Sequence, residues 1–242
     1  MKKLFVDVGN QKQVRLAEND HEHIAYSLRL KPGDSLTLCD GRFDYAAKII
    51  EIKKKETLVE IEDMVAIDSE PEIEVTLFIA ALKSDKLDYA VQKATELGVK
   101  AVVPFVSQCC AAKAESVREE RLGKIALEAA KQCGRGFVPP VYPVVQFNEM
   151  LDLLKAFEAR LFLYEAEEKT DLKSFLRGRK KERKIAVIIG PEGGFSLKEA
   201  EKLRTAAGTG LTLGRRILRA ETAVVAAVAA VMYEYGEWRV KR

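Results

Sequence analysis

Two short segments carry residues suited to binding and catalysis: GPEGGFS at residues 190–196 and LGRRILRAETA at residues 213–223. Gly193 and Gly194 in the first segment permit a positive φ and let another group approach the backbone closely. In the second segment, Arg219 can stabilise developing negative charge, and Glu221 can act as a base or interact with a helix N-terminus. No GxGxxG or GxxxxGK[ST] pattern occurs in the chain, so binding of a dinucleotide or a nucleotide phosphate lacks its usual sequence support.

Each segment lies between a short apolar run and an expected helix. Residues 185–189 are continuously apolar, which is typical of a strand covered on both faces, and residues 211–213 predict a second short strand. Ser196 and Glu199 predict a capping box at the start of the next helix. Open α/β sheets bind ligands at the carboxyl ends of their strands. We therefore expect two neighbouring parallel strands whose loops share one crevice.

Together, GPEGGFS and LGRRILRAETA resemble the paired signature of the SPOUT-superfamily methyltransferases, specifically of the RsmE type. Further matches are VQKATELGV at 91–99, IALEAAKQCGR at 125–135 and the H-x4-LRLKxGD pattern at 23–34, so the resemblance spans nearly the whole chain. It implies methylation of N3 of a uridine in 16S ribosomal RNA with S-adenosylmethionine. One departure is SQCC at 107–110, where many relatives have an arginine before the cysteine, so contacts made by that arginine are not expected here.

The resemblance also implies the site residues and a trefoil knot where the two glycine turns meet. The residues that it assigns to the methyl donor are Leu163, Ile189, Gly190, Glu192, Gly193, Gly194, Leu213, Gly214, Leu218, Thr222 and Ala223. Uridine N3 carries a proton at neutral pH, so catalysis requires a proton acceptor or stabilisation of the anion. We expect Arg219 to be catalytic through a uracil carbonyl. Glu221 is expected to be structural or orienting more often than a base, and Glu192 is an alternative carboxylate.

Composition bounds the class of protein. A chain of 242 residues with 48% hydrophobic content can bury a proper core. The apolar run at 220–232 is short and rich in alanine, and the first ten residues lack an apolar signal region, so we expect a cytoplasmic protein. Metal binding is not expected, because the four cysteines form no C-x-x-C pair and the chain has only two histidines.

The charge is unevenly divided along the chain. Residues 1–55 carry a net charge of +3, residues 56–74 carry −8, and the remainder carries +8. This division predicts two basic surfaces that hold a polyanion, separated by an acidic connector, although ordinary surface charge is an equal alternative.

Residues 1–70 predict a small β-barrel, which by the resemblance is a PUA-like RNA-binding domain. The expected strands are 35–39, 43–52 and 57–61, and a short helix is expected at 19–28. The side chains predicted to contact RNA are His23, Arg29, Lys31, Arg42 and Arg135.

Residues 71–242 alternate strand and helix, which predicts an α/β domain with a parallel sheet. The expected strands are 74–82, 99–106, 161–164 and 185–189. The expected helices include 84–97, 172–176 and 220–235. Two further helices are expected, one that begins at a Ser116–Glu119 capping box and one that is capped by Asn148. The last helix is apolar over much of its circumference, which favours a homodimer. A non-catalytic RNA-binding protein and a nucleotide-dependent oxidoreductase are the alternative functions.

Overall fold

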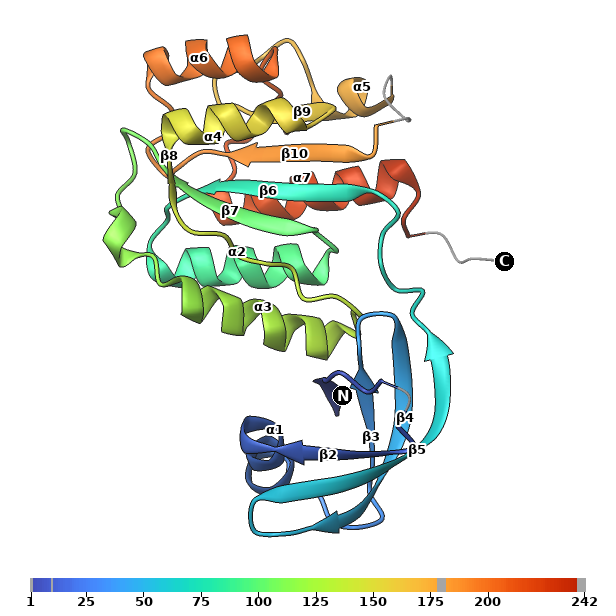
Figure 1. Ribbon diagram of the computed structural model, residues 1–242. Helices are drawn as coiled ribbons and strands as arrows, with labels where there is room; N and C mark the ends of the chain where they lie inside the picture. Colours follow the sequence, from blue (N-terminus) through green and yellow to red (C-terminus); the bar gives the residue numbers. More distant parts are fainter. Residues whose placement is uncertain (1, 10, 178–181, 239–242) are drawn as a thin grey trace. The chain divides into compact units, whose positions relative to one another are not determined.

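The computed structural model describes residues 2–9, 11–177 and 182–238 (Figure 1). The chain divides into two compact units, one made of residues 1–70 and 130–137 and the other of residues 71–129 and 138–242. Within the described residues, no helix has the length and apolar character needed to cross a membrane.

Unit 1 is built on a five-stranded sheet with the order β1-β3-β4-β5-β2. Its strands are β1 (Lys3–Phe5), β2 (Gln13–Ala17), β3 (Ser35–Cys39), β4 (Phe43–Ile52) and β5 (Glu56–Ala66). All neighbours are antiparallel except β1 and β3. The predicted helix at 19–28 is α1 (Glu18–Glu22), continued by one π-helical turn, η1 (His23–Ser27). One face of the sheet and this helix bury Leu16, Ile24, Leu38, Ile49 and Val59.

The predicted acidic connector is wrong for most of its length. Residues 56–66 are β5, which pairs with both β4 and β2. The alternation of acidic and apolar residues reflects a strand with one buried and one solvated face. The strand predicted at 57–61 is therefore confirmed and extends further, and these residues are not a connector.

Arg135 is buried in unit 1, with 4% of its surface exposed. Its Nε and Nη2 donate to Glu70 Oε2 over 3.1 and 2.6 Å, and Gly136 N donates to Glu70 Oε1 over 2.9 Å. Breaking a buried ion pair of this kind is strongly destabilising because one charge is left without compensation. The predicted contact of Arg135 with RNA is not retained, since the guanidinium is already occupied in holding 130–137 to residue 70.

Unit 2 contains a fully parallel five-stranded sheet with the order β8-β7-β6-β10-β9. Its strands are β6 (Glu74–Ala80), β7 (Ala101–Val106), β8 (Val145–Gln146), β9 (Ala159–Leu163) and β10 (Lys184–Ile189). Its helices are α2 (Ser84–Glu96), α3 (Glu119–Cys133), α4 (Phe147–Leu153), α5 (Leu172–Arg177), α6 (Leu197–Ala207) and α7 (Ala220–Tyr235), with 3-10 turns η2 (Ala114–Ser116) and η3 (Leu154–Ala156). The last residues of α3, 130–133, belong to unit 1. The predicted parallel α/β domain is confirmed.

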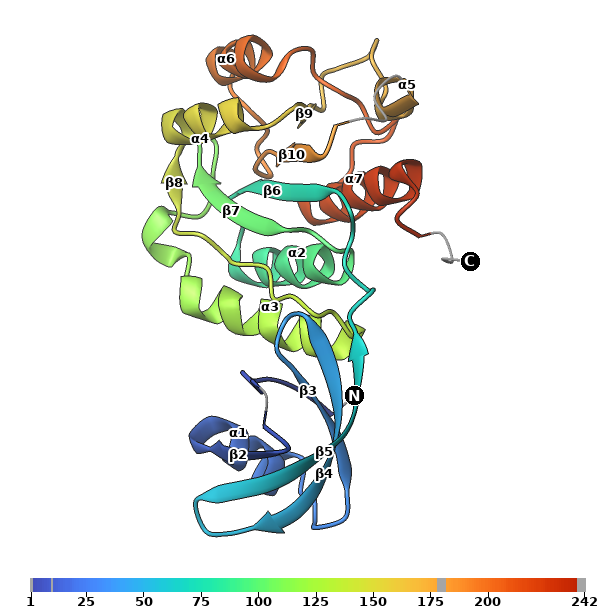
Figure 2. The same ribbon diagram turned by 45° about the vertical axis from the view of Figure 1, so that its right-hand side comes forward.

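Helices cover both faces of this sheet (Figures 1 and 2). Residues of α2, α3, α5 and α7 pack on one face, and residues of α4 and α6 pack on the other. The five apolar residues of β10 are all buried for this reason. Central strands of this kind give a rigid edge from which the following loops extend.

Only one of the three predicted helix caps is correct. Ser196 caps α6 with Glu199 as expected. Ser116 instead lies in η2, and its hydroxyl donates to Lys113 O over 2.6 Å, while α3 begins at Glu119. In α4 the cap is Gln146 with Glu149, not Asn148. The same short pattern fits several local structures, so the path of the chain decides which one forms.

Candidate active site

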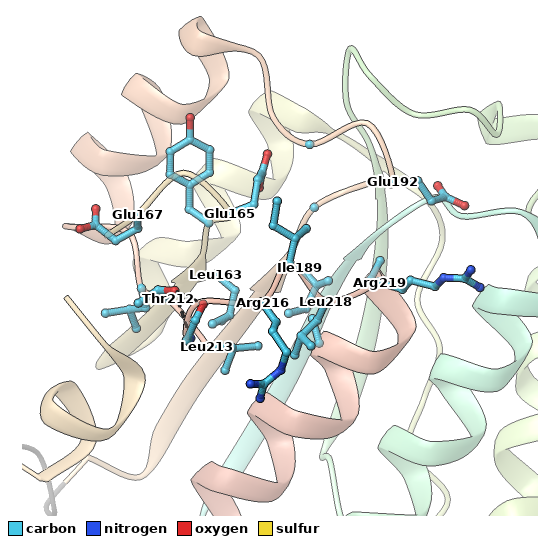
Figure 3. Close-up of a pocket in the computed structure, with 18 of the residues that line it drawn as sticks. Leu163, Glu165, Glu167, Ile189, Glu192, Thr212, Leu213, Arg216, Leu218 and Arg219 are labelled. Atoms are coloured by element: carbon cyan, nitrogen blue, oxygen red, sulfur yellow. Dashed lines mark hydrogen bonds between the residues drawn. The ribbon is translucent and has the colours of Figure 1, made fainter. Parts of the chain in front are cut away.

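A cavity of about 1140 Å³ opens at the carboxyl ends of β9 and β10 in unit 2. Three segments of the chain and Lys86 of α2 line it: the segments are the residues that end and follow β9, the glycine turn after β10, and the segment from Leu211 into the start of α7 (Figure 3). Small-molecule sites usually measure about 300–1,000 Å³. The cavity is therefore large enough for one small-molecule ligand.

The second glycine segment reaches the cavity along β9. Leu211 N donates to Phe162 O over 2.7 Å, and Tyr164 N donates to Leu211 O over 3.0 Å. Further along the segment, Thr212 N donates to Thr170 O over 2.9 Å. The expectation that the two apolar runs are neighbouring strands is wrong, because β9 lies between β10 and Leu211. The shared crevice forms nevertheless, since all three segments end at the same edge of the sheet.

The conformation of the turn after β10 depends on its glycines. Phe195 is buried, and its ring packs directly against Gly190. A Cβ on Gly190 would lie only 2.7 Å from Phe195 Cε2, which is too close. Gly194 has a φ of +71°, and its N–H donates to Pro191 O over 2.9 Å. A Cβ on Gly194 would overlap Glu165 Oε1. The turn therefore needs glycine both for its backbone conformation and for the carboxylate that lies against it.

Charge is arranged unevenly around the cavity. Glu165, Glu167 and Glu168 come from the segment after β9, whereas Arg215, Arg216 and Arg219 come from the segment before α7. In Figure 3, Glu165 and Glu167 lie on one side, and Glu192 and Arg219 lie on the other. The cavity can thus meet cationic or hydroxyl groups on one side and anionic groups on the other.

Glu192 forms an ion pair with Lys86 at 3.1 Å, and both side chains line the cavity. Burial by itself raises the pKa of Glu192, but hydrogen bonds from its own backbone N–H and from Lys86 outweigh that effect and lower the pKa. Glu192 is therefore held ionised and is a weaker base than an ordinary glutamate.

Most residues assigned to the methyl donor come together here. The cavity is lined by Leu163, Ile189, Gly190, Glu192, Gly193, Gly194, Leu213, Gly214, Leu218 and Ala223. Thr222 is not among the lining residues and is exposed on α7. The sequence reading missed Lys86, Tyr164, Glu165, Glu167, Glu168, Pro191, Thr212, Arg215, Arg216 and Ile217. The arginines stood inside a quoted motif, but no local pattern marked the glutamates after β9.

The two predicted catalytic residues lie in different surroundings. Arg219 is the N-cap of α7, is exposed, and lines the cavity. Glu221 lies in the first turn of α7 but does not line the cavity, and its Oε2 is buried with no hydrogen-bond partner among the described residues. A carboxylate at a helix N-terminus is stabilised by the helix dipole. This placement favours a structural role for Glu221.

The remaining residues predicted to contact RNA are in unit 1. Arg29, Lys31 and Arg42 are exposed, and His23 is half-buried in η1. Arg29 has a φ of +52°, and Lys31 N donates to Asp34 Oδ2 over 2.8 Å in the following turn. The exposed basic side chains can contact phosphates, and this role stays a prediction.

Comparison with known proteins agrees with the geometry. Residues 69–232 match the model of an RNA methyltransferase domain, and residues 16–62 match that of an RNA methyltransferase PUA domain. The chain is 34% identical to Ribosomal RNA small subunit methyltransferase E of Rickettsia conorii, over 93% of this chain and 91% of that protein. It is 29% identical to the Bacillus subtilis protein of the same name, over 97% of each.

Solved structures give the same result. One is Ribosomal RNA small subunit methyltransferase E from Neisseria gonorrhoeae bound to S-adenosyl methionine, with 31% identity, a TM-score of 0.87, and coverage of 99% of this chain and 100% of that one. Another is a putative methyltransferase from Legionella pneumophila in complex with S-adenosylmethionine, with 27% identity, a TM-score of 0.85, and coverage of 96% and 97%.

The fold is thus a PUA-like half-barrel followed by a parallel α/β domain of SPOUT-like methyltransferase type. The chain belongs to the RsmE family of 16S ribosomal RNA methyltransferases.

Proposed function

We propose that the chain methylates N3 of a uridine in 16S ribosomal RNA with S-adenosylmethionine as the methyl donor. The observation that carries this proposal is the cavity at the ends of β9 and β10, formed by the two glycine segments of an RsmE-family chain. Relatives with 27–31% identity over nearly the whole chain have been solved with this donor bound.

The residues around the cavity fit such a donor. Leu163, Ile189, Leu213 and Leu218 supply apolar surface for a purine, and the glycines expose backbone groups that can bond its edge. Glu165 and Glu167 can accept from ribose hydroxyls or an ammonium group. When bound, the donor supplies an electrophilic methyl on a sulfonium.

We assign Arg219 the catalytic role. When the N3 proton passes to solvent water, negative charge is left on the uracil carbonyl oxygens, and a guanidinium can stabilise that charge by donating to one of them. N3 would then take the methyl as the S–CH3 bond breaks, which leaves the donor as the neutral thioether. Arg219 lines the cavity and is exposed, so it is available to a base that enters. The lowered pKa of Glu192 disfavours that residue as proton acceptor, and Glu221 does not line the cavity.

For RNA binding we propose the basic trio of unit 1, defined as Arg29, Lys31 and Arg42. The match of residues 16–62 to an RNA methyltransferase PUA domain supports this role. We accordingly assign residues 1–70 as the RNA-binding domain and residues 71–242 as the methyltransferase domain, with the qualification that 130–137 packs with the former.

We further propose that the chain acts as a homodimer through α7. Val225, Ala226 and Ala229 are only half-buried on this helix, and Tyr233 is 70% exposed. Ile217, just before α7, is 82% exposed. A second copy packed on α7 would cover this apolar surface next to the cavity. Sedimentation should give a dimer, and a monomer at micromolar concentration would refute this assignment.

The function is tested in two steps. Calorimetry should show binding of S-adenosylmethionine, which a non-catalytic RNA-binding protein would not show. The purified chain and donor are then incubated with small ribosomal subunits and with free 16S rRNA that lack the modification. A methyl on N3 blocks base pairing, so reverse transcription should stop at one uridine. Methylation at another atom, or none, would refute the assignment.

A further inference from the structure

The glycine turn of the cavity is tied to a second loop by one carboxylate, Glu199, which is 8% exposed. Its Oε2 accepts from Ser196 N over 3.0 Å, and Glu199 N donates to Ser196 Oγ over 3.4 Å, which are the two bonds of a capping box. Its Oε1 accepts from Gln108 N over 2.8 Å, in the loop after β7. The capping box explains the first two bonds and not the third.

This second loop lies directly against the cavity wall. A Cβ placed on Gly193 would be 3.0 Å from Cys109 O and 3.2 Å from Cys109 Cβ. Gly193 itself lines the cavity. Any shift of the loop after β7 is therefore transmitted to the turn that forms the wall.

The loop after β7 is itself fixed as a closed turn. Cys110 N donates to Ser107 O over 3.2 Å, and Ser107 N donates to Cys110 Sγ over 3.3 Å. Behind it, Phe105 of β7 stacks on Phe195 of the glycine turn, with ring centroids 6.3 Å apart and planes 3° from parallel. β7 and β10 are not neighbours, because β6 lies between them. The Glu199 carboxylate thus bridges across the end of β6.

We propose that Glu199 is a positioning residue for methyl-donor binding, acting through the Gln108–Glu199–Ser196 link. The link fixes the position of the glycine turn so that its backbone groups can contact the donor. Charge-assisted hydrogen bonds of a buried carboxylate are strong, and their loss leaves buried N–H groups without partners. This inference rests on the proposed function, since it concerns the same cavity.

The chain offers a matched control. Glu149 occupies the same capping-box position in α4, where its Oε2 accepts from Gln146 N over 2.9 Å, and like Glu199 it does not itself line the cavity. Glu199→Ala and Glu149→Ala each remove a carboxylate that accepts from the N-cap backbone N–H, although Glu199 is buried and Glu149 is exposed. Only Glu199→Ala removes a bond to the loop beside the cavity. Donor affinity by calorimetry and the melting temperature of each variant separate the two effects.

We expect Glu199→Ala to weaken binding of S-adenosylmethionine by about tenfold to a hundredfold, as the loss of one or two charged hydrogen bonds implies. Glu149→Ala should bind the donor as the wild type does. In steady state, the KM for donor should rise more than kcat falls. If Glu199→Ala fails to fold, Glu199→Gln is used instead, because it keeps one acceptor oxygen. For this variant, faster hydrogen exchange at the Gln108 amide would report a weaker hydrogen bond to residue 199.

Unchanged donor affinity in a folded Glu199 variant would overturn the inference, as would an equal loss in the Glu149 control. A wild-type chain that does not bind the donor would instead refute the proposed function, and the two failures are therefore distinct.

Discussion

Replacing Gly194 by alanine should damage the cavity more than the fold. Gly194 has a φ of +71°, a conformation that costs an L-residue about 1–2 kcal/mol. For a protein of this size, each kcal/mol lowers the melting temperature by about 2–4 °C, so we expect a fall of about 2–8 °C. In addition, the new Cβ would overlap Glu165 Oε1. That carboxylate sits at the end of a flexible side chain and would swing away from its present place in the cavity.

The assay is calorimetric titration with S-adenosylmethionine, and the control is Gly208→Ala. Gly208 ends α6 with a φ of +90° and does not line the cavity, and no atom of the described residues outside its own neighbourhood would lie within 4 Å of a Cβ at this position. Gly208→Ala should also lower the melting temperature, because alanine is strained at its φ of +90°. Only Gly194→Ala should lose donor affinity, by about tenfold or more if one charged contact is displaced. Equal donor affinity in the two folded variants would show that the Gly194–Glu165 contact does not shape the binding site.

Three further predictions concern charge. Arg219→Ala should lower the single-turnover rate of methyl transfer by roughly a hundredfold with donor affinity nearly unchanged, and a loss of RNA affinity alone would mark it as a phosphate contact. Replacing the basic trio with alanine should weaken RNA binding and reduce the salt dependence of the affinity. Alanine at the exposed Lys54 and Lys55 should have a smaller effect on both quantities, and an equal effect would refute the basic trio as a specific RNA-binding surface. Glu192 has a lower pKa in the folded protein than in the unfolded chain, so its ionised form stabilises the fold at pH values above the unfolded-state pKa. This contribution is lost as the pH falls through the folded-state pKa. Lys86→Met should therefore reduce the dependence of melting temperature on pH over the acidic range, and an unchanged profile would show that the ion pair does not matter.

Local sequence patterns predicted many elements with accurate limits. The strands at 35–39 and 43–52 and the helix at 220–235 have the predicted bounds. These patterns depend on residues two to four positions apart, which sequence displays directly. Where two local structures satisfy the same pattern, as at Ser116, the prediction was wrong.

The sequence by itself determined the two glycine segments, the alternation of strands and helices in unit 2, and the family. Only the tertiary structure decided that β10 lies between β6 and β9, that Leu211 pairs with the end of β9, and that three glutamates therefore face the cavity. It also decided the partners of buried charges: Arg135 bonds Glu70, and Glu199 bonds Gln108. These contacts join residues 65 and 91 positions apart. Their pairing is set by strand order and by the need to satisfy buried polar groups, neither of which is expressed in the spacing of nearby residues.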